Sequence, residues 1–132
     1  MKKILVIEDD PSLAVLYRIL LSTNGYSYEV ASNGLDGLEK VWNEEPDLVL
    51  LDRKLPDISG LQVLQVLQSD PRSNRIPVIM TSILPPEDAM PRGGSIQGVI
   101  EFHAKPFYVD HLMQHISRML AAAEPQPQLI PA

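Results

Sequence analysis

Two carboxylates in this 132-residue sequence are spaced so that a folded chain could use them together in metal chemistry. Asp9 follows the apolar segment 4–7 closely, within the acidic run Glu8-Asp9-Asp10, and Asp52 directly follows the apolar segment 48–51. If these segments are neighbouring parallel strands, both carboxylates lie at one edge of a sheet and repel each other. A divalent cation would remove that repulsion, and Mg²⁺ typically needs only one or two carboxylates plus waters. The pattern therefore predicts a Mg²⁺ site around Asp9 and Asp52.

Hydroxyl and ammonium groups are expected at the same edge. Thr81 and Ser82 end the apolar segment 78–80, and Lys105 follows the segment 99–102. Because side chains alternate along a strand, only one of the two hydroxyls can point toward Asp52. An ammonium group suits pairing with a phosphoryl oxygen, and a hydroxyl can donate to another. A metal, an ammonium and a hydroxyl around an aspartate favour phosphoryl transfer to the carboxylate.

Short apolar segments alternate with amphipathic ones along the chain. The apolar segments are residues 4–7, 28–31, 48–51, 78–80 and 99–102, and helical periodicity occurs over 13–21, 35–42, 61–67 and 109–120. The first, third and fourth apolar segments have no polar alternation, which is typical of strands buried on both faces. The second is more polar and suits an edge strand. The alternation predicts an α/β fold with a doubly wound parallel sheet.

One segment interrupts this alternation where another helix is expected. Residues 84–94 contain Pro85, Pro86, Pro91, Gly93 and Gly94. A proline inside a helix costs about 3 kcal/mol and a glycine about 1 kcal/mol, so we expect an irregular or shortened fourth helix. Residues 123–132, rich in proline and glutamine, are predicted to be a flexible tail or the start of a linker, which leaves 1–122 as the domain.

The composition argues against several classes of function. A net charge of −6 disfavours nucleic-acid binding through a basic face, and the absence of cysteine excludes disulfides and thiolate chemistry. The longest apolar run is about five residues, far short of the roughly 20 that a membrane helix needs. Acidic residues directly follow the first apolar segment, so no signal-peptide core is present. We expect a soluble, cytoplasmic domain that does not bind a membrane.

Four motifs, in order, resemble the receiver domain of bacterial two-component response regulators, of which CheY is the best-known single-domain form. The motifs are Glu8-Asp9-Asp10-Pro11, Leu50-Leu51-Asp52 with Leu55-Pro56-Asp57 and Gly60, Pro77-Val-Ile-Met-Thr-Ser82, and Phe102-His-Ala-Lys105-Pro106-Phe107. The resemblance covers roughly residues 2–122 and implies a five-stranded sheet of order 2-1-3-4-5, the flavodoxin-like and CheY-like order. It also implies a phosphoacceptor that a sensor histidine kinase or histidine phosphotransfer protein phosphorylates. Such a domain signals to a downstream effector protein or domain and is not an enzyme acting on separate substrates. A weak homodimer is a further expectation for this chain.

The resemblance assigns a role to each polar residue of the motifs. Asp52 corresponds to the phosphoacceptor, Asp9 to a direct Mg²⁺ ligand, and Glu8 to a ligand that acts through metal-bound water. The backbone carbonyl of Lys54 would complete the coordination, and Lys105 would contact the phosphoryl group.

The same motifs locate two residues of a conformational switch. Ser82 lies five residues after Pro77, where the family has its switch hydroxyl, so Ser82 is favoured over Thr81. Phe102 lies three residues before Lys105, at the position of the aromatic switch residue.

Three alternatives remain beside this interpretation. A pseudo-receiver would keep the fold and act as a phosphate-independent interaction module, although every residue that the chemistry needs is present. A haloacid-dehalogenase-type phosphatase needs a second aspartate two residues after the first, where this chain has Lys54. A flavodoxin-like cofactor binder needs a phosphate-cradling loop after the first strand, where the acidic run 8–10 would repel phosphate.

Overall fold

Five parallel strands form one sheet at the centre of the molecule. The structure, a computed structural model, describes residues 1–82, 100–105 and 108–123, with only the backbone described over 100–104. The strands are β1 (Lys3–Ile7), β2 (Ser27–Ala31), β3 (Leu48–Asp52), β4 (Val78–Ser82) and β5 (Ile100–Ala104). Their order is β2-β1-β3-β4-β5, and every neighbouring pair is parallel. The predicted doubly wound sheet and its order are confirmed.

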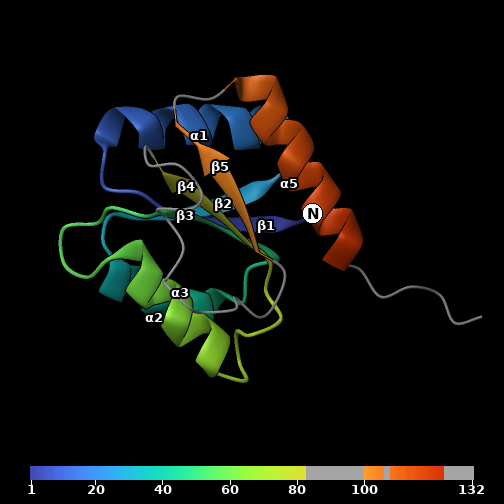
Figure 1. Cartoon of the computed structure of the whole chain (residues 1–132). Coiled ribbons are helices and arrows are strands. Elements are labelled where there is room, and N and C mark those ends of the chain that lie inside the picture. The colour runs from blue at the N-terminus through green and yellow to red at the C-terminus, as the bar shows by residue number, and fades with distance from the viewer. Residues whose placement is uncertain (83–99, 106–107, 124–132) are drawn as a thin grey trace, which may run out of the picture.

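Helices cover both faces of the sheet (Figure 1). The helices α1 (Pro11–Thr23) and α5 (Val109–Ala123) lie on one face, and α2 (Gly34–Glu44) and α3 (Gly60–Ser69) lie on the other. The predicted irregular fourth helix, within residues 84–94, and the tail 124–132 lie outside the described residues. Helix α5 reaches Ala123, one residue beyond the expected end of the domain. None of the helices in the described ranges has the length and apolarity to cross a membrane.

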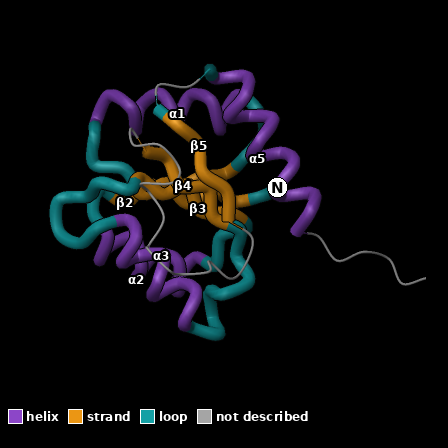
Figure 2. The backbone as a smooth tube through the Cα atoms, viewed as in Figure 1, coloured by secondary structure: helices purple, strands orange, loops and turns teal. Residues whose placement is uncertain are grey.

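The central strands are buried on both faces, which explains their unbroken apolar sequences. In β1, Leu5 and Ile7 pack toward α2 and α3, whereas Ile4 and Val6 pack toward α1 and α5. Every residue of β3 and β4 is buried, while β2 has exposed positions and lies at one edge, as its polar sequence predicts. Figure 2 shows these strands enclosed between the two helical layers. A residue at the end of a central strand is therefore held by a rigid core.

Capping residues start two helices close to the ends of their strands. Asp10 accepts hydrogen bonds from the backbone N–H groups of Ser12 and Leu13, so only three residues separate the end of β1 from the start of α1. Ser59 caps the start of α3 and forms a capping box with Gln62. These caps determine where the chain turns back at the carboxyl edge of the sheet. Glu8 and Asp9 lie in the first of these turns, and Asp52 ends the strand before the second.

Candidate functional site

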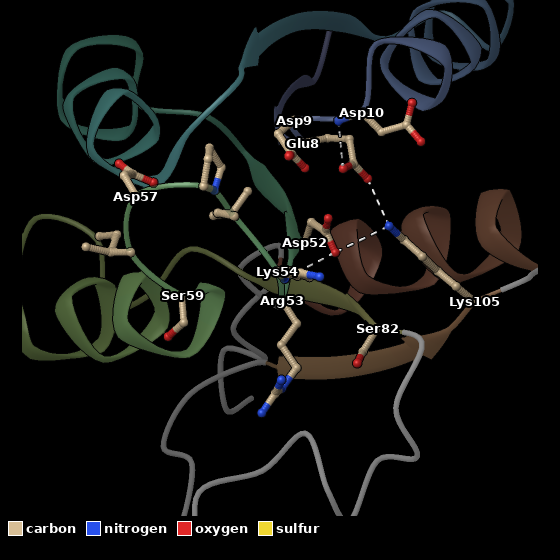
Figure 3. A pocket seen from close by; sticks show the side chains of 13 residues that line it. Glu8, Asp9, Asp10, Asp52, Arg53, Lys54, Asp57, Ser59, Ser82 and Lys105 are labelled. Atoms are coloured by element: carbon tan, nitrogen blue, oxygen red, sulfur yellow. Dashed lines mark hydrogen bonds and ion pairs between the residues drawn. The ribbon is translucent and has the colours of Figure 1, made fainter.

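The predicted site residues meet in a pocket at the carboxyl ends of the strands (Figure 3). The pocket has a volume of about 690 Å³, and its walls include Glu8, Asp9, Asp52, Ser82 and Lys105. Parallel pairing brings these residues together, because the strands that precede them all end at one edge of the sheet. The sequence motifs, far apart along the chain, therefore form one site.

Three carboxylates cluster on one side of this pocket. Glu8, Asp9 and Asp52 each offer an oxygen atom, and these atoms all lie within 4.8 Å of one another. Glu8 and Asp52 are buried, whereas Asp9 is exposed to solvent. Hard carboxylate oxygens with access to water are the donor set that Mg²⁺ prefers, because this ion keeps several of its waters. The residues present therefore fit the ion that the sequence predicts.

Lys105 provides the positive charge within this cluster. Its Nζ atom lies 3.0 Å from Oε1 of Glu8 and 3.3 Å from Oδ1 of Asp52. Burial raises the pKa of Glu8, and the neighbouring Asp52 carboxylate raises it further, while Lys105 opposes the shift. Burial lowers the pKa of Lys105, but Glu8 and Asp52 outweigh it, so the net shift is upward. Crowded negative charge is thus the main electrostatic feature of the site.

The loop between β3 and α3, residues 53–59, forms another wall of the pocket. Its two ends are joined by a hydrogen bond, in which Gly60 N–H donates to the Arg53 carbonyl at 2.7 Å. The Lys54 N–H faces Oδ1 of Asp52 at 3.5 Å, a long and weak contact. Lys54 therefore lies beside the predicted phosphoacceptor, and its side chain is exposed. That its carbonyl is a metal ligand stays a prediction.

The two candidate hydroxyls of β4 differ in their surroundings. Ser82 belongs to the pocket wall, whereas Thr81 is 1% exposed and lies against the Tyr17 hydroxyl of α1. This placement favours Ser82, as the count from Pro77 does. Phe102 pairs with Met80 in the β4–β5 register, while its side chain lies outside what the structure describes. The switch roles of Ser82 and Phe102 stay predictions.

Asp57 is a residue of the pocket wall that belongs to a sequence motif and has no predicted role. Asp57 points away from Asp52 and binds the start of α2, with each of its carboxylate oxygens accepting one backbone N–H (Figure 3). Aspartate is a favoured helix cap, but nothing in the local sequence shows that it caps a helix from a distant loop.

Comparisons with known proteins agree with this geometry. The chain matches the response regulator receiver domain family over residues 4–117 and belongs to that family. It is 32% identical to the phosphate regulon transcriptional regulatory protein PhoB of Rhizobium meliloti, over 94% of this chain and 54% of PhoB. It is also 32% identical to sporulation initiation phosphotransferase F of Bacillus subtilis, over 90% of this chain and 94% of that protein. The chain spans about half the length of PhoB and of the Synechocystis regulator RpaA, to which it is 33% identical over 97% of this chain.

Solved structures show the same fold. The signal receiver domain of a signal transduction histidine kinase from Syntrophus aciditrophicus superposes with a TM-score of 0.85 at 26% identity, covering 100% of this chain and 99% of that one. A CheY-like receiver domain protein from Methanospirillum hungatei gives a TM-score of 0.80 at 25% identity, covering 93% and 96%. The predicted family and fold are confirmed, and the chain is a receiver domain of two-component systems. The three carboxylates and the lysine that phosphorylation needs lie together in this chain, so the pseudo-receiver alternative is not favoured.

Proposed function

We propose that Asp52 accepts a phosphoryl group from a phosphohistidine of a sensor histidine kinase or histidine phosphotransfer protein. One observation carries this proposal: Asp52 ends the central strand with the Lys105 ammonium 3.3 Å from its Oδ1, beside two further carboxylates. In the transfer, an Asp52 oxygen attacks phosphorus and forms the new O–P bond. The N–P bond to the donor imidazole breaks, and its electron pair returns to the imidazole nitrogen, which is then protonated from solvent.

Each neighbouring side chain has a task in this step. Glu8 and Asp9, together with Asp52 and the Lys54 carbonyl, would hold Mg²⁺, which supplies charge neutralisation at the phosphoryl oxygens. Lys105 binds one phosphoryl oxygen, and the Ser82 hydroxyl donates to another. The protein thus contributes positioning and electrostatic stabilisation rather than acid–base catalysis. On this proposal the domain catalyses only its own phosphorylation and dephosphorylation and is not an enzyme with a separate substrate.

The phosphorylated state is then transmitted to an effector protein or domain. As the family implies, Ser82 would move toward the phosphoryl oxygens and Phe102 would turn inward. The same proposal includes a cytoplasmic location, a downstream effector and a weak homodimer.

A small phosphodonor tests the proposal without any partner protein. Incubation with acetyl phosphate and Mg²⁺ should give a base-labile, acid-stable phosphoryl group that peptide mapping assigns to Asp52. Chelation of Mg²⁺ should abolish the labelling. Labelling that survives chelation, or that maps to another residue, would overturn the assignment.

Replacing Asp9 by alanine should weaken Mg²⁺ binding sharply. The substitution removes one of the three clustered carboxylates and the only exposed one. We expect a loss of at least about tenfold in Mg²⁺ affinity, measured by calorimetric titration. The metal-free protein should become slightly more stable, because repulsion among the carboxylates decreases.

A matched control for that variant is Asp10→Asn. Asp10 lies next to Asp9 but belongs to the cap of α1, and asparagine caps a helix about as well as aspartate. Its Mg²⁺ titration should match that of the wild type. If Asp9→Ala also titrates like the wild type, Asp9 does not bind the metal.

The partner that delivers the phosphoryl group needs a surface next to the pocket, and α1 offers one. The exposed side chains of Val15, Leu16 and Ile19 form an apolar surface on this helix, with Val15 and Ile19 each 54% exposed. Because Asp10, the cap of α1, lies in the pocket wall, a protein docked on this surface would lie near Asp52. We propose that an amphipathic helix of the phosphodonor protein docks there.

Replacing Ile19 by lysine should therefore slow transfer from a phosphorylated histidine kinase by roughly tenfold, as the loss of one central apolar contact predicts. Transfer from acetyl phosphate should stay unchanged, since the pocket is not altered. Val66→Lys on α3 is the control, because Val66 is also apolar and exposed, at 38%, but belongs to the opposite face of the sheet. Equal slowing by both variants would place the docking surface elsewhere.

A further inference from the structure

Asp57 connects the β3–α3 loop to a different helix. Its Oδ1 atom accepts a hydrogen bond from the Gly34 N–H and its Oδ2 atom accepts one from the Leu35 N–H, both at 2.8 Å. These are the first N–H groups of α2. We propose that Asp57 is a positioning residue, which holds the loop 53–59, and with it the Lys54 carbonyl, in the geometry that Mg²⁺ binding at Asp52 requires. This inference rests on the proposed function of the site.

The two hydrogen bonds join the Asp57 carboxylate to N–H groups at a helix start, which bind a negative charge strongly. The first N–H groups of a helix have no partner within the helix, and they carry the positive end of its dipole. A carboxylate bound there makes charge-assisted hydrogen bonds. Burial alone would raise the pKa of Asp57, but the N–H groups of Leu35 and Gly34 outweigh it and keep the pKa below its ordinary value. Asp57 is thus a charged acceptor for these bonds at neutral pH.

A second contact holds the same part of the loop against α2. The side chain of Ile58 lies over Gly34, so closely that a Cβ at this glycine would come within 2.6 Å of Cγ1 of Ile58. Ile58 also packs against the core between the sheet and α2 and α3, as does Leu55 from within the loop. The loop therefore meets α2 through one polar and one apolar contact at adjacent residues.

Further hydrogen bonds hold the loop at its two ends. Asp52 is fixed by the sheet, and the Ser59 capping box and the bond from Gly60 N–H to the Arg53 carbonyl fix the start of α3. Between these ends, Asp57 supplies the hydrogen bonds to α2, and its carboxylate points away from Asp52 (Figure 3). With both oxygens bound to α2, Asp57 acts on the site by holding the loop rather than by contacting the phosphoryl group.

The test compares Asp57→Ala with Asn33→Ala. Asn33 caps the same end of α2 from its own chain segment, accepting the Asp36 N–H at 2.8 Å, and does not belong to the loop. Both variants therefore remove a cap from α2, and only one releases the loop. Asp57→Asn keeps one acceptor oxygen and should restore part of the wild-type behaviour.

Two measurements separate the roles. In metal-free protein, amide hydrogen exchange at Lys54 and Gly60 should be faster in Asp57→Ala than in wild type and unchanged in Asn33→Ala. Calorimetric titration should show Mg²⁺ affinity about tenfold weaker in Asp57→Ala, at the lower end of the effects of residues that orient metal ligands. Labelling by acetyl phosphate should need correspondingly more Mg²⁺, while its rate at saturating Mg²⁺ changes less.

The outcomes are distinguishable from those that test the proposed function. If Asp57→Ala exchanges and titrates like wild type, or if Asn33→Ala shows the same changes as Asp57→Ala, the positioning role is wrong. If the wild type itself neither binds Mg²⁺ nor becomes labelled, the proposed function of the site fails, and the metal-binding part of the inference fails with it. The exchange comparison in metal-free protein then still decides whether Asp57 holds the loop.

Discussion

Replacing Asp52 by asparagine should abolish formation of the acyl phosphate and leave the domain folded. Asparagine has nearly the same shape, but its amide is a poor nucleophile and cannot form the O–P bond of an acyl phosphate. The fold should persist because the substitution removes one of three crowded carboxylates and leaves Lys105 paired with Glu8 at 3.0 Å. Incubation with acetyl phosphate and Mg²⁺, followed by intact-mass measurement, should show no phosphorylated species.

The control is again Asp10→Asn, which makes the same chemical change two residues beyond Glu8 in the wall of the same pocket. This variant should be labelled like the wild type. If Asp52→Asn carries a base-labile phosphoryl group at the normal rate, the phosphoacceptor is another residue. A loss of labelling in both variants would instead point to a general effect of charge in the pocket.

Replacing Gly60 by alanine should destabilise the domain by about 3 kcal/mol, the upper part of the range for forcing atoms into a packed site. A Cβ at this position would overlap the carbonyl oxygen of Asp52 and lie 2.7 Å from Cα of Arg53. Both are backbone atoms, so they cannot move aside as the end of a flexible side chain would. For a domain of this size, such a loss lowers the melting temperature by roughly 10 °C.

The clash should also impair phosphorylation, because the backbone that must move to relieve it is that of Asp52, the proposed phosphoacceptor. Labelling of Gly60→Ala by acetyl phosphate should therefore be slowed even at temperatures where the variant is folded.

Gly25→Ala is the matched control for this substitution. Gly25 has a φ of +82°, and no atom lies within 4 Å of the position that its Cβ would take, so alanine there introduces backbone strain without a clash. We expect a cost of roughly 1 kcal/mol and normal labelling. Equal destabilisation by the two substitutions would mean that the close approach to Asp52 is not what requires Gly60.

Much of the architecture could be predicted from the sequence, because strands and helices follow from patterns of apolar residues within short segments. Unbroken apolar segments predict strands buried on both faces, and β1, β3 and β4 are such strands. The carboxylates after β1 and β3 could be paired in advance, because parallel strands end at the same edge. The order of the strands, by contrast, came from the resemblance to receiver domains, since periodicity does not specify which strands are neighbours.

The choice between Ser82 and Thr81 shows where sequence and structure each contribute. The two-residue period of a strand implies that only one hydroxyl can point toward Asp52, and the count from Pro77 favours Ser82. The structure adds the surroundings, with Ser82 in the pocket wall and Thr81 against Tyr17. The predictions for residues 84–94 and for the Phe102 side chain fall outside the described residues and stay predictions.

Only the tertiary structure decided the roles of Asp57 and Gly60. Asp57 caps a helix whose first N–H group belongs to a residue 23 positions earlier, and no periodicity or motif indicates which helix end a loop carboxylate will meet. Gly60 has an ordinary negative φ, so backbone conformation does not require a glycine there. A glycine is needed because the start of α3 approaches the backbone of Asp52 and Arg53 too closely for a Cβ atom. Strands and helices follow from repeating patterns of apolar residues within one segment. Contacts between a loop and a distant backbone depend on how those segments pack, and packing is a property of the whole chain.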